Sequence, residues 1–362
     1  MVLELTQKVI LTALDILNGA SVWLIISFVL AGLMHNLISP DRLQRMLGNR
    51  SVSALIKATA SGMLLPICSC GVIPLGLGLY YSGAYLGPTL AFMTATPIIN
   101  PAAVLLAYGF LGPQIATIYL VAGFVVPMLI GMIGNKLAGP EIHAPGMEGP
   151  VEMRELEPGE QAGLVQKLQT GLRWGFLDMG VSVSKYVCVG MLLAGFIIVL
   201  APPAFIQEYL GNPGLISVAG IAVLGAIMYV CAVGHIPFIA ALIASGAAPG
   251  LAITFLMTGA ATNLPELISM YKMIGRRTVL IYSSVLLSTS FIVGYLTNLF
   301  LLPGFTPFFD LSKSRQTVGM ANNLIFAAPE PLRYLCTAVV LLLGVYALWP
   351  GFKRALAKVR AA

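Results

Sequence analysis

The hydropathy of the chain alternates between long apolar runs and short polar segments, as is typical of a protein that crosses a membrane several times. A helix needs about 20 apolar residues to cross the hydrocarbon core of a bilayer. Apolar runs of this length predict spanning helices at 20–38, 113–135, 181–201, 278–302 and 332–350. The apolar segment 2–18 also carries Glu4, Lys8 and Asp15, so we expect it to lie at the membrane interface or to begin the first span.

Four further apolar segments, 53–81, 85–112, 214–245 and 248–271, are interrupted by proline and glycine. Proline removes a backbone donor and clashes with the preceding helical turn. At membrane depth each freed backbone group needs a partner inside the protein or in a wet cavity, and broken helices of this kind form the binding sites of many transporters. We therefore expect the functional site at these interruptions, with helix breaks at Pro66, Gly71, Pro74, Pro97, Pro101, Gly234, Pro237 and Pro265.

The second half of the chain repeats the first, without gaps, at a shift of 163 residues. This alignment is supported by identity at residue types that seldom match by chance in an apolar chain. Examples are Cys68/Cys231, Gly71/Gly234, Pro74/Pro237 and Asn100/Asn263. An internal duplication of this kind is frequent in transporters. The predicted organisation is a first membrane unit at 1–137, a hydrophilic linker at 138–168, a second unit at 169–302, an extracytoplasmic loop at 303–330, and an extra helix with a basic tail at 331–362.

The charged residues predict that the two units lie in the membrane in opposite orientations. The basic loop 39–57 is matched by loop 201–214, whose only charge is Glu208, whereas the uncharged turn 110–113 is matched by the basic turn 271–277. Loops rich in Lys and Arg stay on the cytoplasmic side. The expected fold is an all-α polytopic membrane protein with an inverted-topology internal repeat, in which broken or re-entrant helices meet near the midplane.

Composition agrees with a membrane protein and excludes several other classes. The chain is 58% hydrophobic and 9% charged, against about 25% charge in a soluble domain. Its net charge of +6 is located at predicted membrane edges, so we expect no nucleic-acid partner. Nucleotide-binding and zinc-protease motifs are missing, which favours secondary transport over an ATP-driven pump; we expect neither enzymatic activity nor a cofactor. The expected partners are the lipid bilayer and a small-molecule or ion substrate, while the oligomeric state, a homo-oligomer included, stays open.

We expect the protein in the inner membrane of a bacterium or archaeon, with linker 138–168 and the C-terminus in the cytoplasm.

Two thiols on the first interruption, Cys68 and Cys70, are candidate substrate ligands. Thiolates are soft ligands for metals such as Cu(I), Zn(II) and arsenic-like metalloids, so these two cysteines would hold a metal as the transported substrate. Inverted symmetry would bring Cys231 toward the same centre. The alternative is that these cysteines are small packing residues, as buried cysteines often are.

His235 and Glu266 are candidate groups for proton coupling. Ionisable residues at membrane depth commonly mark ion or substrate pathways, and a histidine can also bind a metal or other substrate. The repeat aligns Ala103 with Glu266 and Val72 with His235, so each of these ionisable residues occurs in the second unit without a counterpart in the first. Alternatively, His235 is a satisfied polar residue within the bundle and Glu266 pairs with Lys272.

Hydroxyl and amide side chains flank the second interruption of each unit and are candidate substrate ligands. They are Thr94, Thr96 and Asn100 in the first unit and Thr258, Thr262 and Asn263 in the second. The same groups can instead cap the half-helices or satisfy freed backbone atoms. Asp15 and Asp178, which are repeat mates, are expected to cap a helix or to anchor it at the interface.

The runs Pro66-Ile-Cys-Ser-Cys-Gly-Val-Ile-Pro74 and Pro97-Ile-Ile-Asn-Pro101 resemble the bacterial predicted-permease family that includes the organoarsenical efflux permeases. Gly234-His-Ile-Pro237 is similar to the second repeat of that family. The resemblance implies export of trivalent organoarsenicals, or of copper or zinc as in related permeases, with Cys68 and Cys70 as the soft-ligand site.

These observations favour a secondary transporter that exports a soft metal or metalloid species by alternating access, coupled to proton entry. Two alternatives remain at the level of sequence. One is a membrane thiol–disulfide electron carrier using Cys68 and Cys231, which would need their Cα atoms within about 7 Å. The other is an importer of a small sulfur-containing solute.

Overall fold

The computed structural model describes residues 2–37, 46–65, 69–144, 164–200, 214–227, 247–301 and 329–360, together with residues 232, 235, 236, 239, 240 and 243. All regular elements in these ranges are helices. The first unit contains α1 (Val2–Leu37), α3 (Val52–Met63), α4 (Ser69–Tyr81), α5 (Leu86–Ile98), α6 (Pro101–Phe110), α7 (Gly112–Leu137) and the short helix η1 (Pro140–Ile142).

The second unit contains matching helices. They are α8 (Leu164–Arg173), the π-helical turn η4 (Trp174–Gly180), α9 (Val181–Leu200), α11 (Leu215–Ile227), α13 (Pro249–Ala261), α14 (Leu264–Met273) and α15 (Arg276–Leu301), followed by the C-terminal α17 (Glu330–Arg360).

The lengths and composition of these helices confirm an all-α polytopic membrane protein. Within the described ranges four helical stretches, 112–137, 168–193, 276–301 and 330–349, are long and apolar enough to cross a membrane. The number rises to seven if each of three bent helix pairs counts as one span. One bent pair lies within α1, whose parts Glu4–Asp15 and Ala20–Leu33 meet at 45°. The other two pairs, α5 with α6 and α13 with α14, are each bent by 43°.

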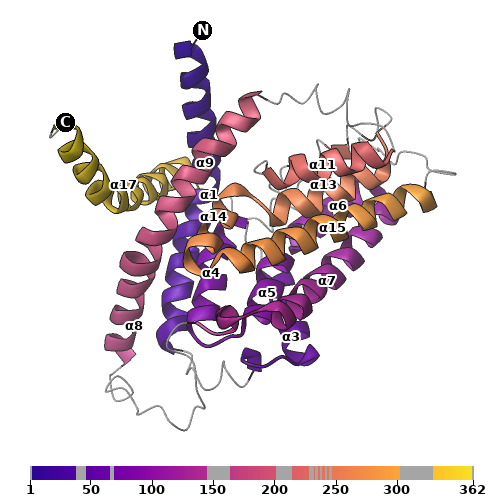
Figure 1. The fold of residues 1–362 in the computed structure, drawn as a ribbon, viewed down its shortest axis with the longest axis horizontal. Helices are drawn as coiled ribbons and strands as arrows, with labels where there is room; N and C mark the ends of the chain where they lie inside the picture. The colour runs from indigo at the N-terminus through magenta and orange to yellow at the C-terminus, as the bar shows by residue number, and fades with distance from the viewer. Residues whose placement is uncertain are drawn as a thin grey trace.

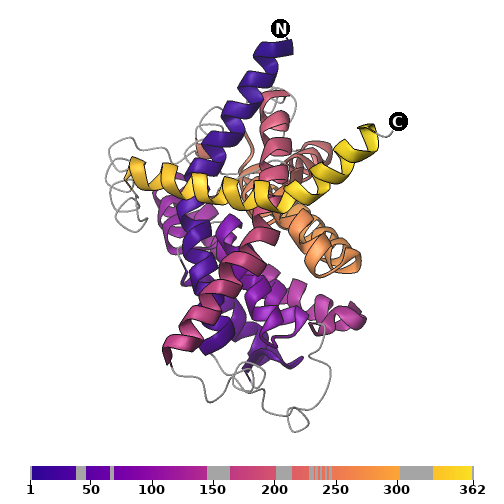
Figure 2. The same cartoon turned by 90° about the vertical axis from the view of Figure 1, so that its left-hand side faces the viewer.

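The two units pack in corresponding ways around a shared core. In the first unit α5 packs on α3 and α7, and in the second α13 packs on α11 and α15. The units meet where α7 contacts α15 and α5 contacts α13 (Figure 1). Helix α1 packs against α4, α8 and α9, and Figure 2 shows α17 lying across α1 and α9.

Pairs of glycines allow the central helices of each unit to approach closely. A Cβ on Gly87 would overlap the Gly131 carbonyl and the Asn135 amide, and a Cβ on Gly250 would overlap the Gly294 carbonyl. Small residues at such crossings let membrane helices make backbone contact. The close packing therefore fixes the N-terminal ends of α5 and α13 against α7 and α15.

Described residues of three segments that the charges assign to the cytoplasm contact the end of α4 or the turn that follows it. The Tyr85 amide donates to the carbonyl of Leu47 in loop 39–57 at 3.0 Å. The hydroxyl of Tyr80 donates to the carbonyl of His143 in the linker, and that of Tyr81 donates to the carbonyl of Met273, each at 2.7 Å. These contacts are what the predicted topology requires, although the opposite orientation of the two units stays a prediction.

The predicted helix breaks at Gly71 and Pro74 are wrong, because α4 runs through both residues. Helix α3 ends at Met63 and α4 begins at Ser69, and the described residues between them, Leu64 and Leu65, are not helical. Pro74 lacks the N–H that would bond to the carbonyl of residue 70, but a helix can continue past one missing bond when its neighbours hold it. Pro66 lies in this gap and outside the described residues.

Candidate functional site at two matched helix breaks

The first break separates α5 from α6 at Ile99 and Asn100. The Asn100 Oδ1 accepts a hydrogen bond from the Ala103 amide at 2.9 Å and so caps α6. Pro101 follows in the first turn, where its missing donor leaves nothing unpaired. Pro97 is inside α5, one residue before its last. The predicted interruption at 97–101 is thus present, and the described role of Asn100 is a helix cap.

The second break, between α13 and α14, has the same construction at Thr262 and Asn263. The Asn263 Oδ1 accepts from the Glu266 amide at 3.0 Å and caps α14, whose first turn contains Pro265. Each cap satisfies one of the amides that a helix start leaves unpaired. The matched bend of 43° in both units therefore has a matched local cause.

Two tyrosines hold the carbonyl ends of the broken helices. Tyr119 on α7 donates its hydroxyl proton to the carbonyl of Ile98, and Tyr282 on α15 donates to the carbonyl of Ala261. These four residues are related by the same shift of 163. A carbonyl in the last turn of a helix has no partner within that helix, so the tyrosines supply one in the buried interior of the bundle.

Two asparagines hold the opposite ends of the same helices. The Asn135 Oδ1 accepts from the Gly87 amide at 2.9 Å, and the Asn298 Oδ1 accepts from the Gly250 amide at 2.6 Å. Each of the helices α5 and α13 is therefore held at its start by an asparagine and at its end by a tyrosine, both from the following long helix.

These tyrosines and asparagines were missed by the sequence analysis. Their signal is in the sequence, since the register of 163 residues continues past residue 112 to Tyr119/Tyr282, Gly131/Gly294 and Asn135/Asn298. Each of these tyrosines and asparagines is an isolated polar residue within a predicted apolar span.

Glu266 breaks the symmetry of the two sites. Its side chain is 0% exposed, and its Oε2 accepts from the Asn263 Nδ2 at 3.2 Å. The Tyr282 hydroxyl is 3.4 Å from its Oε1. In the described part of the chain these two neutral side chains are the carboxyl's hydrogen-bond partners. Lys272 is not among them, so the alternative pairing of Glu266 with Lys272 is not seen in the described residues; the Lys272 ammonium lies 5.4 Å from the centre of the Tyr271 ring.

The candidate threonines support the backbone of the broken helices. Thr96, Thr258 and Thr262 each donate to the carbonyl four residues earlier in their own helix. Thr94 does the same, with the Leu90 carbonyl as acceptor.

The predicted thiol centre falls largely on residues that the structure does not describe. Cys68, Cys231, Gly234 and Pro237 lie outside the described residues, and only the backbone of Cys70, in the first turn of α4, is described. His235 is half-buried, with its ring centre 6.2 Å from that of Phe255 on α13. The roles of the cysteines and of His235 therefore remain predictions.

The two aspartates of the repeat do not cap helices. Asp15 is inside α1 and Asp178 is inside η4, and both are exposed. Of the two predicted roles, an anchor at the membrane interface is the one that remains.

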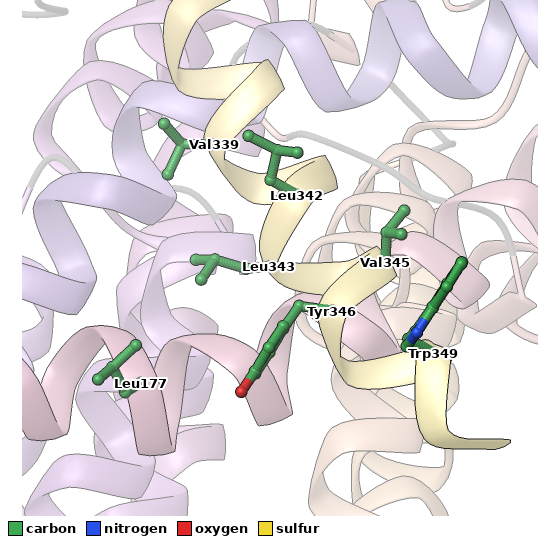
Figure 3. A pocket seen from close by; sticks show the side chains of 7 residues that line it. All are labelled: Leu177, Val339, Leu342, Leu343, Val345, Tyr346 and Trp349. Atoms are coloured by element: carbon green, nitrogen blue, oxygen red, sulfur yellow. The ribbon is translucent and has the colours of Figure 1, made fainter. Parts of the chain in front are cut away.

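A separate apolar groove of about 740 Å³ lies between α17 and η4. Figure 3 shows its lining side chains, among them Leu177, Leu343, Tyr346 and Trp349. None of the predicted site residues contributes to it, and its surface carries no charge. The helix breaks, not this groove, are the candidate functional site.

Bent helix pairs that meet inside a polytopic bundle, with a buried carboxyl beside one bend, are features of a membrane permease. The sequence profile of a predicted-permease family matches residues 6–299, and the chain belongs to that family.

Similar proteins occur in both bacteria and archaea. A UPF0718 protein of Methanocaldococcus jannaschii is 23% identical, covering 83% of this chain and 98% of its own length. The UPF0718 protein YraQ of Escherichia coli is 27% identical over 76% of this chain and 77% of its own. The UPF0718 protein YcgR of Bacillus subtilis is 26% identical over 74% of this chain and 88% of its own. No solved structure matches the chain.

Proposed function

We propose that this permease is a secondary transporter that exports a soft metal or metalloid species, such as a trivalent organoarsenical, in exchange for protons. The observation that carries the proton part is Glu266, a fully buried carboxyl at a helix break whose hydrogen-bond partners are neutral. Burial of a charged carboxylate without a cation is costly, and such residues at membrane depth are rare unless they serve transport. A carboxyl that is neutral when buried and charged when hydrated can carry one proton in each cycle.

The breaks support alternating access. Every residue of α5 and α13 is buried, so a solute can reach the breaks only when neighbouring helices move. The same asparagine and tyrosine contacts hold both broken helices, which favours movement of each unit as a rigid body around the shared site. The contacts of Leu47, His143 and Met273 with neighbouring tyrosines support a common, cytoplasmic side for their segments in an inner membrane.

The substrate part of the proposal rests on Cys68 and Cys70. Two thiols separated by one residue can share a soft ion, and they stand in the sequence directly before and within the first turn of α4. His235, Thr96, Asn100 and Asn263 are the further groups that we assign to the substrate pathway. With Cys231 they would surround a midplane site between the two units.

The test is proton-driven uptake of a trivalent organoarsenical, or of Cu(I), into everted membrane vesicles, whose outer face is the cytoplasmic one. We expect uptake by the wild type when the lumen is acidic, and loss of gradient-dependent uptake in Glu266→Gln. Asp15→Asn is the matched control, because it removes an exposed carboxyl, and it should behave as wild type. The double variant Cys68→Ser with Cys70→Ser should lose uptake of soft species.

Equal uptake in wild type and in Glu266→Gln, or uptake that is indifferent to the gradient, contradicts proton coupling. Equal uptake in the double cysteine variant contradicts thiol capture.

A further inference from the structure

Tyr282 has two acceptors for a single proton. Its hydroxyl donates to the carbonyl of Ala261, at the end of α13, and its oxygen also lies 3.4 Å from the Oε1 of Glu266. A phenol has one O–H to donate. The short bond goes to the carbonyl, so in the described arrangement the contact with the carboxyl is the weaker of the two.

The first unit shows what this arrangement looks like without the carboxyl. Tyr119 donates to the Ile98 carbonyl in the same way, but the residue that corresponds to Glu266 there is Ala103, which offers no acceptor. The bond from tyrosine to carbonyl is therefore common to both breaks, and competition for the tyrosine proton is particular to the second.

Loss of the proton from Glu266 would change which of the two acceptors, the Ala261 carbonyl or the Glu266 carboxylate, receives the hydrogen bond of Tyr282. A carboxylate accepts a hydrogen bond roughly twice as strongly as a neutral carbonyl does. The proton of Glu266 leaves to water, the phenolic proton stays on Tyr282, and the hydrogen bond of Tyr282 moves from the Ala261 carbonyl to the Glu266 carboxylate. This releases the carbonyl at the end of α13, which at membrane depth must find a new partner.

We propose that Tyr282 is the positioning residue that couples the protonation of Glu266 to the conformation of the break between α13 and α14. This inference rests on the proposed function, in which Glu266 carries the proton. While Glu266 is protonated, the Ala261 carbonyl keeps its hydrogen bond from Tyr282, and the break between α13 and α14 keeps the conformation described here.

Other titratable groups on the helices packed against α14 do not form hydrogen bonds with Glu266 in the described part of the chain. On α9 the Lys185 ammonium lies 5.5 Å from the centre of the Tyr186 ring. On α4 the hydroxyls of Tyr80 and Tyr81 bond to backbone carbonyls at the linker and at Met273. The remaining titratable groups on these helices are Cys188, Arg276, Arg277, Tyr295 and Cys70, and the side chain of Cys70 is outside the described residues.

The test compares Tyr282→Phe with its matched control Tyr119→Phe by infrared difference spectroscopy of the purified full-length protein in lipid, across a pH titration. The carboxyl band that disappears in Glu266→Gln reports the proton directly and needs no substrate. We expect Tyr282→Phe to move the midpoint of that band to higher pH by about one to two units, because the carboxylate loses a donor. Tyr119→Phe, which loses the same bond to a carbonyl, should leave the midpoint unchanged.

The outcomes separate the two claims. If no carboxyl band is lost in Glu266→Gln at any pH, Glu266 does not carry a proton and the proposed function fails together with this inference. If the band is present but Tyr282→Phe and Tyr119→Phe have the same midpoint, the coupling role of Tyr282 is refuted while the proton site stands. Circular dichroism of both variants verifies that each is folded.

Discussion

Replacing Gly250 by alanine should destabilise the second membrane unit. The added Cβ would overlap the carbonyl of Gly294 and would crowd the Asn298 amide, whose Oδ1 accepts from the Gly250 amide at 2.6 Å. Overpacking typically costs about 1–3 kcal/mol, and loss of the hydrogen bond adds about 1 kcal/mol. The lower backbone entropy of alanine in the unfolded chain returns about 0.4–1 kcal/mol. We therefore expect a net loss of about 1–3.5 kcal/mol.

The assay is unfolding of the purified protein in mixed micelles by titration with SDS, followed by circular dichroism. Gly214→Ala is the matched control, because a Cβ on Gly214 meets no atom within 4 Å, and it should unfold at the wild-type SDS fraction or slightly above it, since it keeps the entropic gain without the overlap. Gly87→Ala, at the equivalent crossing in the first unit, should be destabilised to a similar degree. Identical transitions for Gly250→Ala and Gly214→Ala would refute the close helix crossing.

Three further predictions follow from the contacts at the breaks and at the cytoplasmic end. Asn100→Ala should lower the free energy of unfolding by about 1 kcal/mol through loss of a cap, measured by the same titration. Asn263→Ala should lose the cap of α14 and also proton-driven uptake, since Asn263 is a hydrogen-bond partner of the Glu266 carboxyl. Retention of uptake would contradict a role for this break in proton coupling. Tyr81→Phe, which removes the bond to the Met273 carbonyl, should increase hydrogen exchange of the α14–α15 turn in mass spectrometry, and unchanged exchange would show that this bond does not join the units.

The repeat made much of the fold predictable from the sequence. Proline, asparagine and glycine constrain the backbone locally, so the break at 97–101 and its mate near Asn263 could be placed without coordinates. The charges of the loops assign Leu47, His143 and Met273 to one side of the membrane, and all three contact residues at or just after the end of α4; the orientation itself stays a prediction. The breaks depend on local backbone preferences, and the sides of the loops depend on how charges distribute across a bilayer. Both can be inferred from residue types along the sequence.

The remaining features depend on packing between distant helices. Gly71 and Pro74 do not break α4, because the effect of a glycine or proline in a helix is decided by what its neighbours satisfy. The contacts of Tyr282 and Asn298 arise from the crossing of α13 with α15, which no local pattern specifies. Glu266 was singled out because it lacks a repeat mate, but its neutral hydrogen-bond partners became known only from the structure.

The most direct test of the account is substrate-driven proton movement in proteoliposomes. Vesicles that contain a trivalent organoarsenical and a pH-sensitive dye are diluted into substrate-free buffer of equal pH, so that the outward substrate gradient is the only driving force. The account predicts acidification of the lumen by the wild type and none by Glu266→Gln, with substrate exchange at equal concentrations retained in the variant. Outward movement of substrate without any pH change in the wild type, or equal acidification in Glu266→Gln, would contradict it.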